Sequence, residues 1–335
     1  MTVLVTGATG FLGRRLTQLL VSSGERPRVL VRSLDRLADD EVDIYAGDVA
    51  DRALLEAAVD GVDRVLHCAA RTGPWGPDSE YERTNVSGLE TLVRTAMAAG
   101  VRRFVHVSSI TVHGNDVRGE ADEASPLRVE PNPYSRSKVA GERLLGRLIR
   151  DEGAPVTIVR PGWIYGPGDS ASFARIAQRV ERGQMITLGS GTNHLPLIYV
   201  DDVAEGIVLA SEAARAEGRS YLLVNDERVT QRDFIGAIAA ELGVAAPRRH
   251  IPYPLALKLG ALSEARARLS RSKHPPPVMR YGLQLLGGEN RFVIERARRE
   301  LGFSPEVDLA EGVRRSVSWY RGAGDRMAAT AGAAR

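Results

Sequence analysis

Cysteine is almost absent from this sequence, and so are long apolar runs and a strong excess of one charge. The 335 residues include a single cysteine, Cys68, which excludes an internal disulfide and fits a reducing compartment. No apolar run is long enough to cross a bilayer, and we expect neither a secretory leader nor stable membrane insertion. The 45 basic and 42 acidic residues give a formal charge of +3, too balanced to favour nucleic acid. The spacing of His67, His106 and His113 matches no metal-ligand pattern, so we expect no metal site. The single cysteine leads us to expect a cytoplasmic protein.

Glycine, by contrast, is plentiful, and three glycines near the start form a motif. Residues 3–5 are typical of a buried strand, and Gly7, Gly10 and Gly13 follow them directly. Residues 14–20 then place apolar side chains at helical spacing. Glycine permits a tight turn, close approach of a pyrophosphate and close packing of helix on strand, while the helix N-terminus offers amide donors. The pattern predicts a dinucleotide site, with a glycine-rich turn that binds nothing as the alternative.

The residues after the second predicted strand, residues 28–31, bear on which dinucleotide binds. An acidic residue here would accept hydrogen bonds from the ribose hydroxyls of NAD, whereas an arginine suits the 2′-phosphate of NADP. The chain has Arg32 and Ser33 at this place, with Arg36 as a further donor and Asp35 close by. We therefore expect NADP(H), while NAD(H) stays open because of Asp35 and because Arg32 could be a solvated surface residue.

Three more predicted strands continue the alternation of strand and helix. Residues 44–49 end in an acidic turn where Asp48 could bond the adenine amino group. Residues 65–70 run into small residues that leave room for the adenosine ribose, and residues 104–107 end at a pair of serines. Because such alternation requires a parallel sheet, we predict an α/β fold with a Rossmann-type doubly wound parallel sheet and a smaller C-terminal substrate-binding cap.

Tyr134 and Lys138 lie four residues apart, so a helix would place both side chains on one face. A free tyrosine has a pKa of about 10 and is a poor base near neutrality, but a neighbouring ammonium favours the phenolate. The pair could then exchange a proton with a carbinol or carbonyl oxygen, which a serine hydroxyl opposite would hold. An ordinary amphipathic helix can carry the same spacing, but the glycine motif and the serines favour the catalytic interpretation.

At these motifs the chain resembles the extended short-chain dehydrogenase/reductase family, over about residues 1–320. The motifs with counterparts there are TGATGFLG at residues 6–13 and the segments 47–49, 67–70, 85–88, 108–114 and 160–168. The resemblance implies that Tyr134 is the acid/base and that Lys138 lowers its pKa and binds the nicotinamide ribose. It also implies that Ser109, rather than Ser108, polarises the reacting oxygen.

The resemblance further implies a cofactor site whose members come from six segments of the chain. They are Gly7, Thr9, Gly10, Phe11, Leu12, Arg32, Ser33, Asp48, Val49, Ala69, Ala70, Tyr134, Lys138, Pro161, Gly162 and Ile164. The family's usual arrangement implies a homodimer through helices near residues 80–99 and 134–150.

The second half of the chain resembles one branch of the family, which contains 3β-hydroxysteroid dehydrogenases and bacterial 2-alkyl-3-oxoalkanoate reductases. The similarity lies in the Trp-Gly pair at residues 75–76 and in residues 275–281. Trp75, Ile110 and Trp163 would then be apolar walls for a small-molecule alcohol or ketone that is sterol-like or β-keto acyl-like, although each tryptophan could equally serve packing alone. We therefore expect an NADP-dependent oxidoreductase acting on CH–OH groups.

Two other functions stay open at this point. Nucleotide-sugar epimerases and dehydratases share the same core, but they usually carry an asparagine where Trp163 stands and an arginine before a strand like residues 198–202. A non-enzymatic NADP sensor on this fold is the third hypothesis. The intact set of Ser109, Tyr134 and Lys138 argues against a sensor, which has no need of a proton relay.

We divide the chain into residues 1–165, an NADP-binding core, and residues 166–321, mainly a cap from which residues 196–225 return to the core. Residues 322–335 are small and polar, and we expect them to be disordered.

An apolar segment, residues 251–262, is followed by Arg266, Arg268, Arg271 and Lys273. It could be an amphipathic patch that rests on a membrane or receives a lipophilic or acyl-carrier substrate. It could equally be a cap helix with a solvated basic face, which the shortness of the apolar part favours.

Overall fold

A central parallel sheet organises the molecule, for which the computed structural model describes residues 1–32, 41–117 and 119–333. Its seven strands are β1 (Val3–Thr6), β2 (Arg28–Val31), β3 (Asp43–Ala46), β4 (Arg64–His67), β5 (Arg103–Val107), β7 (Val156–Pro161) and β11 (Ser220–Leu223). Their order is β11-β7-β5-β4-β1-β2-β3, and all neighbours are parallel. The chain builds outward from β1 in one direction and then from β4 in the other. This confirms the predicted doubly wound α/β fold and places the switch point, where such folds bind ligands, between β1 and β4.

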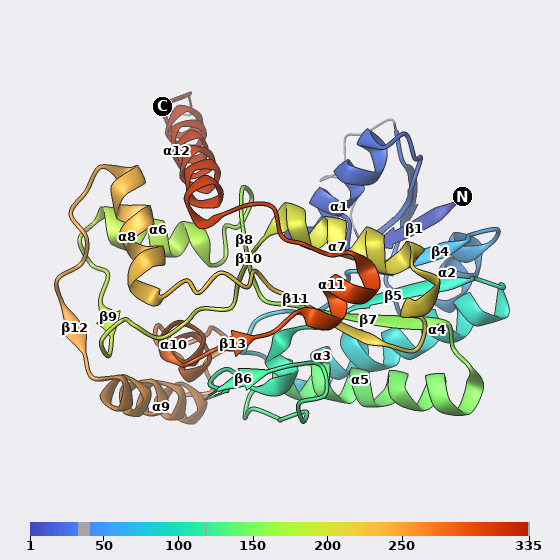
Figure 1. Ribbon diagram of the computed structural model, residues 1–335, viewed down its shortest axis with the longest axis horizontal. Coiled ribbons are helices and arrows are strands. Elements are labelled where there is room, and N and C mark those ends of the chain that lie inside the picture. The colour runs from blue at the N-terminus through green and yellow to red at the C-terminus, as the bar shows by residue number, and fades with distance from the viewer. Residues whose placement is uncertain (33–40, 118, 334–335) are drawn as a thin grey trace.

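Helices cover both faces of this sheet, which explains why its strands are apolar without alternation (Figure 1). Side chains of β1 alternate between the two layers, with Val3 and Val5 in one core cluster and Leu4 in the other. One face carries α1 (Phe11–Ser22), α7 (Val200–Glu212) and α11 (Glu295–Leu301). The other carries α2 (Arg52–Val59), α4 (Gly88–Ala98) and α5 (Pro133–Glu152). Between α2 and α4 the chain forms α3 (Asp78–Glu82) and a π-helical turn, η2 (Arg83–Ser87).

The rest of the second half forms a cap at one end of the sheet, on the left in Figure 1. An apolar cluster that includes Phe173, Phe234 and Val313 joins α6 (Phe173–Glu181), α8 (Gln231–Leu242) and α12 (Leu309–Ala333). The remaining helices are α9 (Tyr253–Leu269), α10 (Arg280–Gly287) and the short 3-10 turns η3 (Ile110–His113) and η4 (Ala214–Ala216). Three two-stranded pairs complete the fold: β8 (Trp163–Tyr165) with β10 (Leu197–Tyr199), β9 (Thr187–Leu188) with β12 (His250–Ile251), and β6 (Glu120–Ala121) with β13 (Arg291–Phe292). The predicted boundary at residue 165 stays a prediction.

The C-terminal segment differs from the expectation of disorder from residue 322. Helix α12 continues as far as Ala333. Residues 322–333 are rich in alanine, which has the highest helix propensity of all residues, so a composition of small residues does not by itself indicate an irregular chain.

The turn between β1 and α1 depends on two glycines that lie in contact. Gly7 has a φ of +74°, which favours glycine, and a Cβ on Gly13 would lie 2.1 Å from the carbonyl oxygen of Gly7. Helix α1 therefore begins closer to β1 than a side chain would allow. This approach brings the first amides of the helix to the end of the strand, where the site lies.

Replacing Gly13 with alanine should destabilise the protein, because backbone rather than a flexible side chain would have to move. We expect the free energy of unfolding to fall by about 1–3 kcal/mol, as in other overpacked sites. Gly236 is a matched control, since it lies inside α8 with open space around its Cα and no positive φ. Gly236→Ala should raise stability by about 0.5–1 kcal/mol. Urea titration measures the free energy of unfolding of both variants. Equal changes in the two variants would contradict the close contact between Gly13 and Gly7.

Candidate active site

A cavity of about 670 Å³ lies at the carboxyl ends of the central strands, between the sheet and helix α10 of the cap. It gathers the predicted site residues from both halves of the chain. Those that line it are Gly7, Thr9, Gly10, Phe11, Leu12, Arg32, Asp48, Val49, Ala69, Ala70, Ser109, Ile110, Tyr134, Lys138, Pro161, Gly162, Trp163 and Ile164. Of the other predicted members, Ser33 lies outside the described residues, as do Asp35 and Arg36, and Trp75 lies elsewhere.

The glycine turn forms one wall of the cavity and fits a dinucleotide. Gly10 is the N-cap of α1 and has no side chain with which to cap the helix, so the amides of the first turn are free to meet a phosphate. A Cβ on Gly7 would lie 2.7 Å from the backbone nitrogen of Ala69, so the turn also lies directly against the end of β4. Beyond the turn, the small side chains of Ala69 and Ala70 leave space beside it.

Charged side chains gather where β2 and β3 end. Arg32 is exposed and lines the cavity beside Asp48, and its charge helps to lower the pKa of that carboxyl group. The larger cause is a hydrogen bond that Asp48 accepts from the backbone of Ala50. Arg83, from η2, donates to Asp48 at 3.1 Å. This part of the cavity therefore offers two guanidinium groups as well as the carboxylate, and Arg83 was not predicted.

The structure brings Ser109, Tyr134 and Lys138 together. Ser109 is the second residue after β5 and caps η3, while Asn132 caps α5 and fixes where Tyr134 and Lys138 emerge. The ammonium of Lys138 donates to the backbone carbonyl of Val107 at 2.8 Å, which ties α5 to the end of β5. Its Nζ lies 6.0 Å from the centre of the Tyr134 ring.

Burial is the main influence on the pKa of Tyr134, and the expected role of Lys138 in lowering that pKa stays a prediction. Burial raises the pKa of Tyr134, and a hydrogen bond with Ser109 acts in the opposite direction. Burial also lowers the pKa of Lys138 to about 8, while the carboxylate of Glu142 raises it. The ammonium of Lys138 is directed at the Val107 carbonyl. The phenol of Tyr134 is protonated near neutral pH and is poised as a proton donor.

A buried network lies behind the catalytic pair and engages the hydroxyl of Ser108. The hydroxyl of Ser108 donates to Glu142 at 2.5 Å, and Arg160 forms hydrogen bonds with the same carboxylate at 2.7 to 3.2 Å. Arg160 also contacts the ring of His113 at 3.1 Å, and burial together with the Arg160 charge lowers the pKa of His113 to about 4. The network joins the end of β5, α5 and the start of the segment Pro161–Gly162 that lines the cavity.

Asn85 has a structural place beside the site. Its side chain accepts from the backbone nitrogen of Arg71 at 2.7 Å and donates to the Arg71 carbonyl at 3.0 Å and to Ser137 at 2.8 Å. It therefore holds the segment after β4 against α5.

The cap supplies side chains that the sequence did not reveal as site residues. Tyr281 and Leu285 of α10 line the cavity, and the ring of Tyr281 meets that of Tyr134 edge to face, with centroids 6.3 Å apart. Tyr281 also forms a hydrogen bond with Thr111, whose hydroxyl accepts from Ser109 at 3.0 Å. A chain of hydroxyl groups thus runs from the cap to Ser109. Arg71, Thr72 and Ser170 are further lining residues that sequence motifs did not single out.

The two predicted tryptophan walls have different positions. Trp163 lines the cavity, with its indole nitrogen bonded to Ser172 at 3.1 Å and its ring against Phe234. Trp75 is not at the cavity, because its indole nitrogen donates to the carbonyl of Ser272 at 3.2 Å and Arg268 lies over its ring. It packs against the segment after α9, so its assignment as a substrate wall is corrected.

Comparison with known proteins agrees with this geometry. The sequence pattern of the NAD dependent epimerase/dehydratase family matches residues 3–223. The chain belongs to this family. A protein of Stenotrophomonas maltophilia named 2-alkyl-3-oxoalkanoate reductase is 32% identical, over 94% of this chain and 98% of its own. A protein of Mycobacterium tuberculosis named 3 beta-hydroxysteroid dehydrogenase/Delta 5→4-isomerase is 29% identical, over 95% and 90%.

Solved structures of the same fold include enzymes named for different substrates. The crystal structure of gox2253 superposes with a TM-score of 0.81 at 29% identity, covering 96% of this chain and 98% of that one. The dTDP-glucose 4,6-dehydratase DesIV of Streptomyces venezuelae, with NAD bound, has a TM-score of 0.76 at 27% identity and coverages of 96% and 97%. The fold is thus shared with a solved nucleotide-sugar enzyme.

The contact between Tyr281 and Tyr134 predicts a change in pH dependence. Tyr281 helps to raise the pKa of Tyr134, so Tyr281→Phe should lower that pKa. Oxidation of an alcohol needs the phenolate, and its rate should therefore reach its plateau at a lower pH in the variant than in the wild type. The pH profile of kcat measures this, with Tyr320→Phe on α12 as a control. An unchanged profile, or a loss of NADPH affinity, would contradict the placement of Tyr281.

Proposed function

We propose that this protein is an NAD(P)-dependent oxidoreductase that interconverts a secondary alcohol and a ketone on a mainly hydrophobic substrate. The observation that carries the proposal is one cavity that holds Ser109, Tyr134 and Lys138 beside the glycine turn, with apolar walls beyond them. Those walls come from Ile110, Trp163 and Leu285. The names of the relatives in Stenotrophomonas and Mycobacterium support the same class of reaction.

The proton chemistry follows from the ionisation of the site. When bound, a nicotinamide would supply or accept the hydride, and the protein would orient and polarise the reacting groups. In reduction, the carbonyl oxygen of the substrate accepts hydrogen bonds from Ser109 and Tyr134, which stabilise the negative charge that develops on it. Tyr134 is protonated near neutral pH, as any phenol is, and burial raises its pKa further; it transfers its proton to that oxygen. The ammonium of Lys138 stabilises the phenolate that remains, and in oxidation the same transfers run in reverse.

The cofactor we propose is NADP(H), on the basis of Arg32. The guanidinium stands at the end of β2, where a 2′-phosphate on the adenosine ribose would lie, and Arg83 adds positive charge nearby. Asp48 lies between them and would bond the adenine amino group. The names of the solved relatives mention NAD, so NAD(H) remains the second choice.

A nucleotide-sugar epimerase or dehydratase is the alternative, because the fold of DesIV superposes over nearly the whole chain. Such an enzyme must hold a sugar diphosphate beside the nicotinamide. In this chain that region is bounded by Trp163, whose indole is fixed by Ser172 and Phe234. The apolar surface favours a ketone without a diphosphate. The expected cytoplasmic location and the homodimer through residues 80–99 and 134–150 stay predictions.

If Tyr134 is the acid/base, removal of its hydroxyl oxygen should have a large effect on turnover. Tyr134→Phe should lower turnover of a hydrophobic ketone by about 10²–10⁴-fold, because the proton donor is lost. NADPH affinity should persist, since the glycine turn is untouched. Absorbance of NADPH measures turnover and its fluorescence measures binding, while Tyr320→Phe is the control. Turnover at the wild-type rate in Tyr134→Phe would disprove the assignment of Tyr134 as the acid/base.

The cofactor assignment predicts a selective effect at Arg32. Arg32→Ala should raise the Kd for NADPH by about ten- to a hundredfold, the equivalent of a lost hydrogen bond to a charged group. The Kd for NADH should hardly change, because NADH has no 2′-phosphate. Arg52→Ala removes an exposed guanidinium on α2 that pairs with Glu56 and serves as the control. An equal loss of both cofactors, or a wild-type preference for NADH, would disprove the role.

A further inference from the structure

Helix α9 of the cap exposes a row of leucines. Leu255, Leu259, Leu262 and Leu269 are 46%, 47%, 67% and 87% exposed. Their spacing of four, three and seven residues places them on one side of the helix. Most exposed apolar residues of a protein are scattered singly and need no explanation. A continuous row along one helix is different, because it indicates a surface for another body.

The opposite side of α9 is already occupied. Ala256, Gly260, Glu264 and Ala267 are buried, and a Cβ on Gly260 would lie 2.8 Å from Leu283 of α10. The carboxylate of Glu264 accepts from the backbone and side chain of Arg280 at 2.7 to 3.0 Å. Small residues and this ion pair therefore fix α9 on α10, and the leucines lie on the other side of the helix.

Basic side chains accompany the leucines. Lys258 and Arg266 lie on α9, and Arg271 and Lys273 follow it. None of these four forms an ion pair with an acidic residue in the described part of the chain. Residues 250–280 contain six basic residues and one acidic residue, the buried Glu264. The surface around the leucines is therefore strongly positive.

The turn after α9 has a further peculiarity at Arg271. Its φ of +51° makes it the one non-glycine residue with a positive φ among those the structure describes. This is the position after a helix at which glycine is usual, because a side chain is disfavoured in the left-handed region. The chain holds an arginine there in a conformation that would favour glycine, and this arginine follows the end of the leucine row at Leu269 by two residues.

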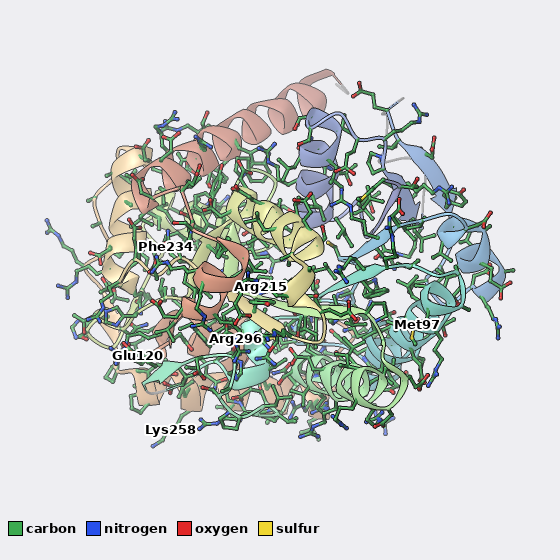
Figure 2. The ribbon with its side chains drawn as sticks, turned by 45° about the vertical axis from the view of Figure 1, so that its right-hand side comes forward. Met97, Glu120, Arg215, Phe234, Lys258 and Arg296 are labelled. Atoms are coloured by element: carbon green, nitrogen blue, oxygen red, sulfur yellow. The ribbon has the colours of Figure 1, made fainter. Side chains whose placement is uncertain are left out.

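We propose that this side of α9, with the turn to Lys273, docks on an anionic lipid surface. The helix lies at the lower edge of the molecule in Figure 1, and Figure 2 shows the side chain of Lys258 directed away from the protein. The leucine row extends over about 21 Å of helix. Leucines that enter the acyl boundary, flanked by basic residues at the headgroups, are the pattern of a helix that lies in a membrane interface. No helix in the described ranges has the length and apolarity needed to span a bilayer.

The docking face adjoins the candidate active site through α10. This helix packs on α9 and carries Tyr281 and Leu285 into the cavity. Trp75 and Arg268 join the end of α9 to the segment after β4. A lipid-dissolved ketone or alcohol would therefore leave the membrane beside the mouth of the cavity. This route for the substrate rests on the proposed function, whereas docking itself does not.

Sedimentation of the full chain with vesicles tests the docking without cofactor or substrate, so its outcome is independent of activity. We expect binding to vesicles of mixed phosphatidylcholine and phosphatidylglycerol at low salt, and at least tenfold weaker binding to phosphatidylcholine alone. The double variant Leu259→Glu/Leu262→Glu should lose at least tenfold in binding to the mixed vesicles. Ile44→Glu is the matched control, because Ile44 is a 38% exposed apolar residue on β3, far from α9, and should bind as the wild type.

A second variant tests the basic turn without disturbing the helix. Arg271→Gly/Lys273→Ser should bind the mixed vesicles several-fold more weakly, while its thermal midpoint stays at or above that of the wild type because glycine suits the positive φ. Wild-type binding by either double variant, or equal binding of the wild type to both vesicle types, would overturn the proposal. A concentration-dependent dimer that Leu259→Glu/Leu262→Glu dissociates, with no vesicle binding, would instead make α9 an interface between copies of this chain.

Discussion

The hydrogen bond from the buried ammonium of Lys138 to the backbone carbonyl of Val107 is the contact on which the site depends. It joins α5 to the end of β5, and Ser109 is the second residue after that strand. Burial lowers the pKa of Lys138 to about 8, so the carbonyl and the carboxylate of Glu142, one turn further along α5, are needed to stabilise the charged form. The same carboxylate binds Ser108 and Arg160. One helix face thus positions the proton donor, its cation and the strand ends around them.

The fold and the cofactor half of the site could be predicted because their signals are local. A strand buried on both faces reads as a short apolar run, and all five strands predicted in the first half are present with boundaries shifted by a few residues. The glycine turn needs no distant partner, since Gly7 and Gly13 meet within one strand–turn–helix unit. The four-residue spacing of Tyr134 and Lys138 likewise fixes their common face as soon as α5 forms.

The substrate half could not be predicted in the same way, because cap loops and helices decide it. Tyr281 reaches Tyr134 only through the packing of α10 over the sheet, and the spacing between the two residues in the chain carries no periodic signal. Trp75 is an aromatic residue of the kind that lines apolar pockets, but it packs against the turn after α9. The pKa of Tyr134 depends on its burial and on the neighbouring Tyr281 and Ser109, which the motif does not specify. These features depend on contacts between segments far apart in the chain.

Hydride transfer from labelled NADPH tests whether this protein reduces a hydrophobic ketone. Wild-type protein would be incubated with NADPH deuterated at C4, in each of the two stereochemical forms, and a hydrophobic ketone such as a β-keto acyl compound or a 3-ketosteroid. We expect one of the two forms of deuterated NADPH to place deuterium on the carbinol carbon of the alcohol product, with one NADPH consumed for each product molecule formed. A product that forms from a nucleotide sugar without net consumption of NADPH, with ketones unchanged, would contradict it.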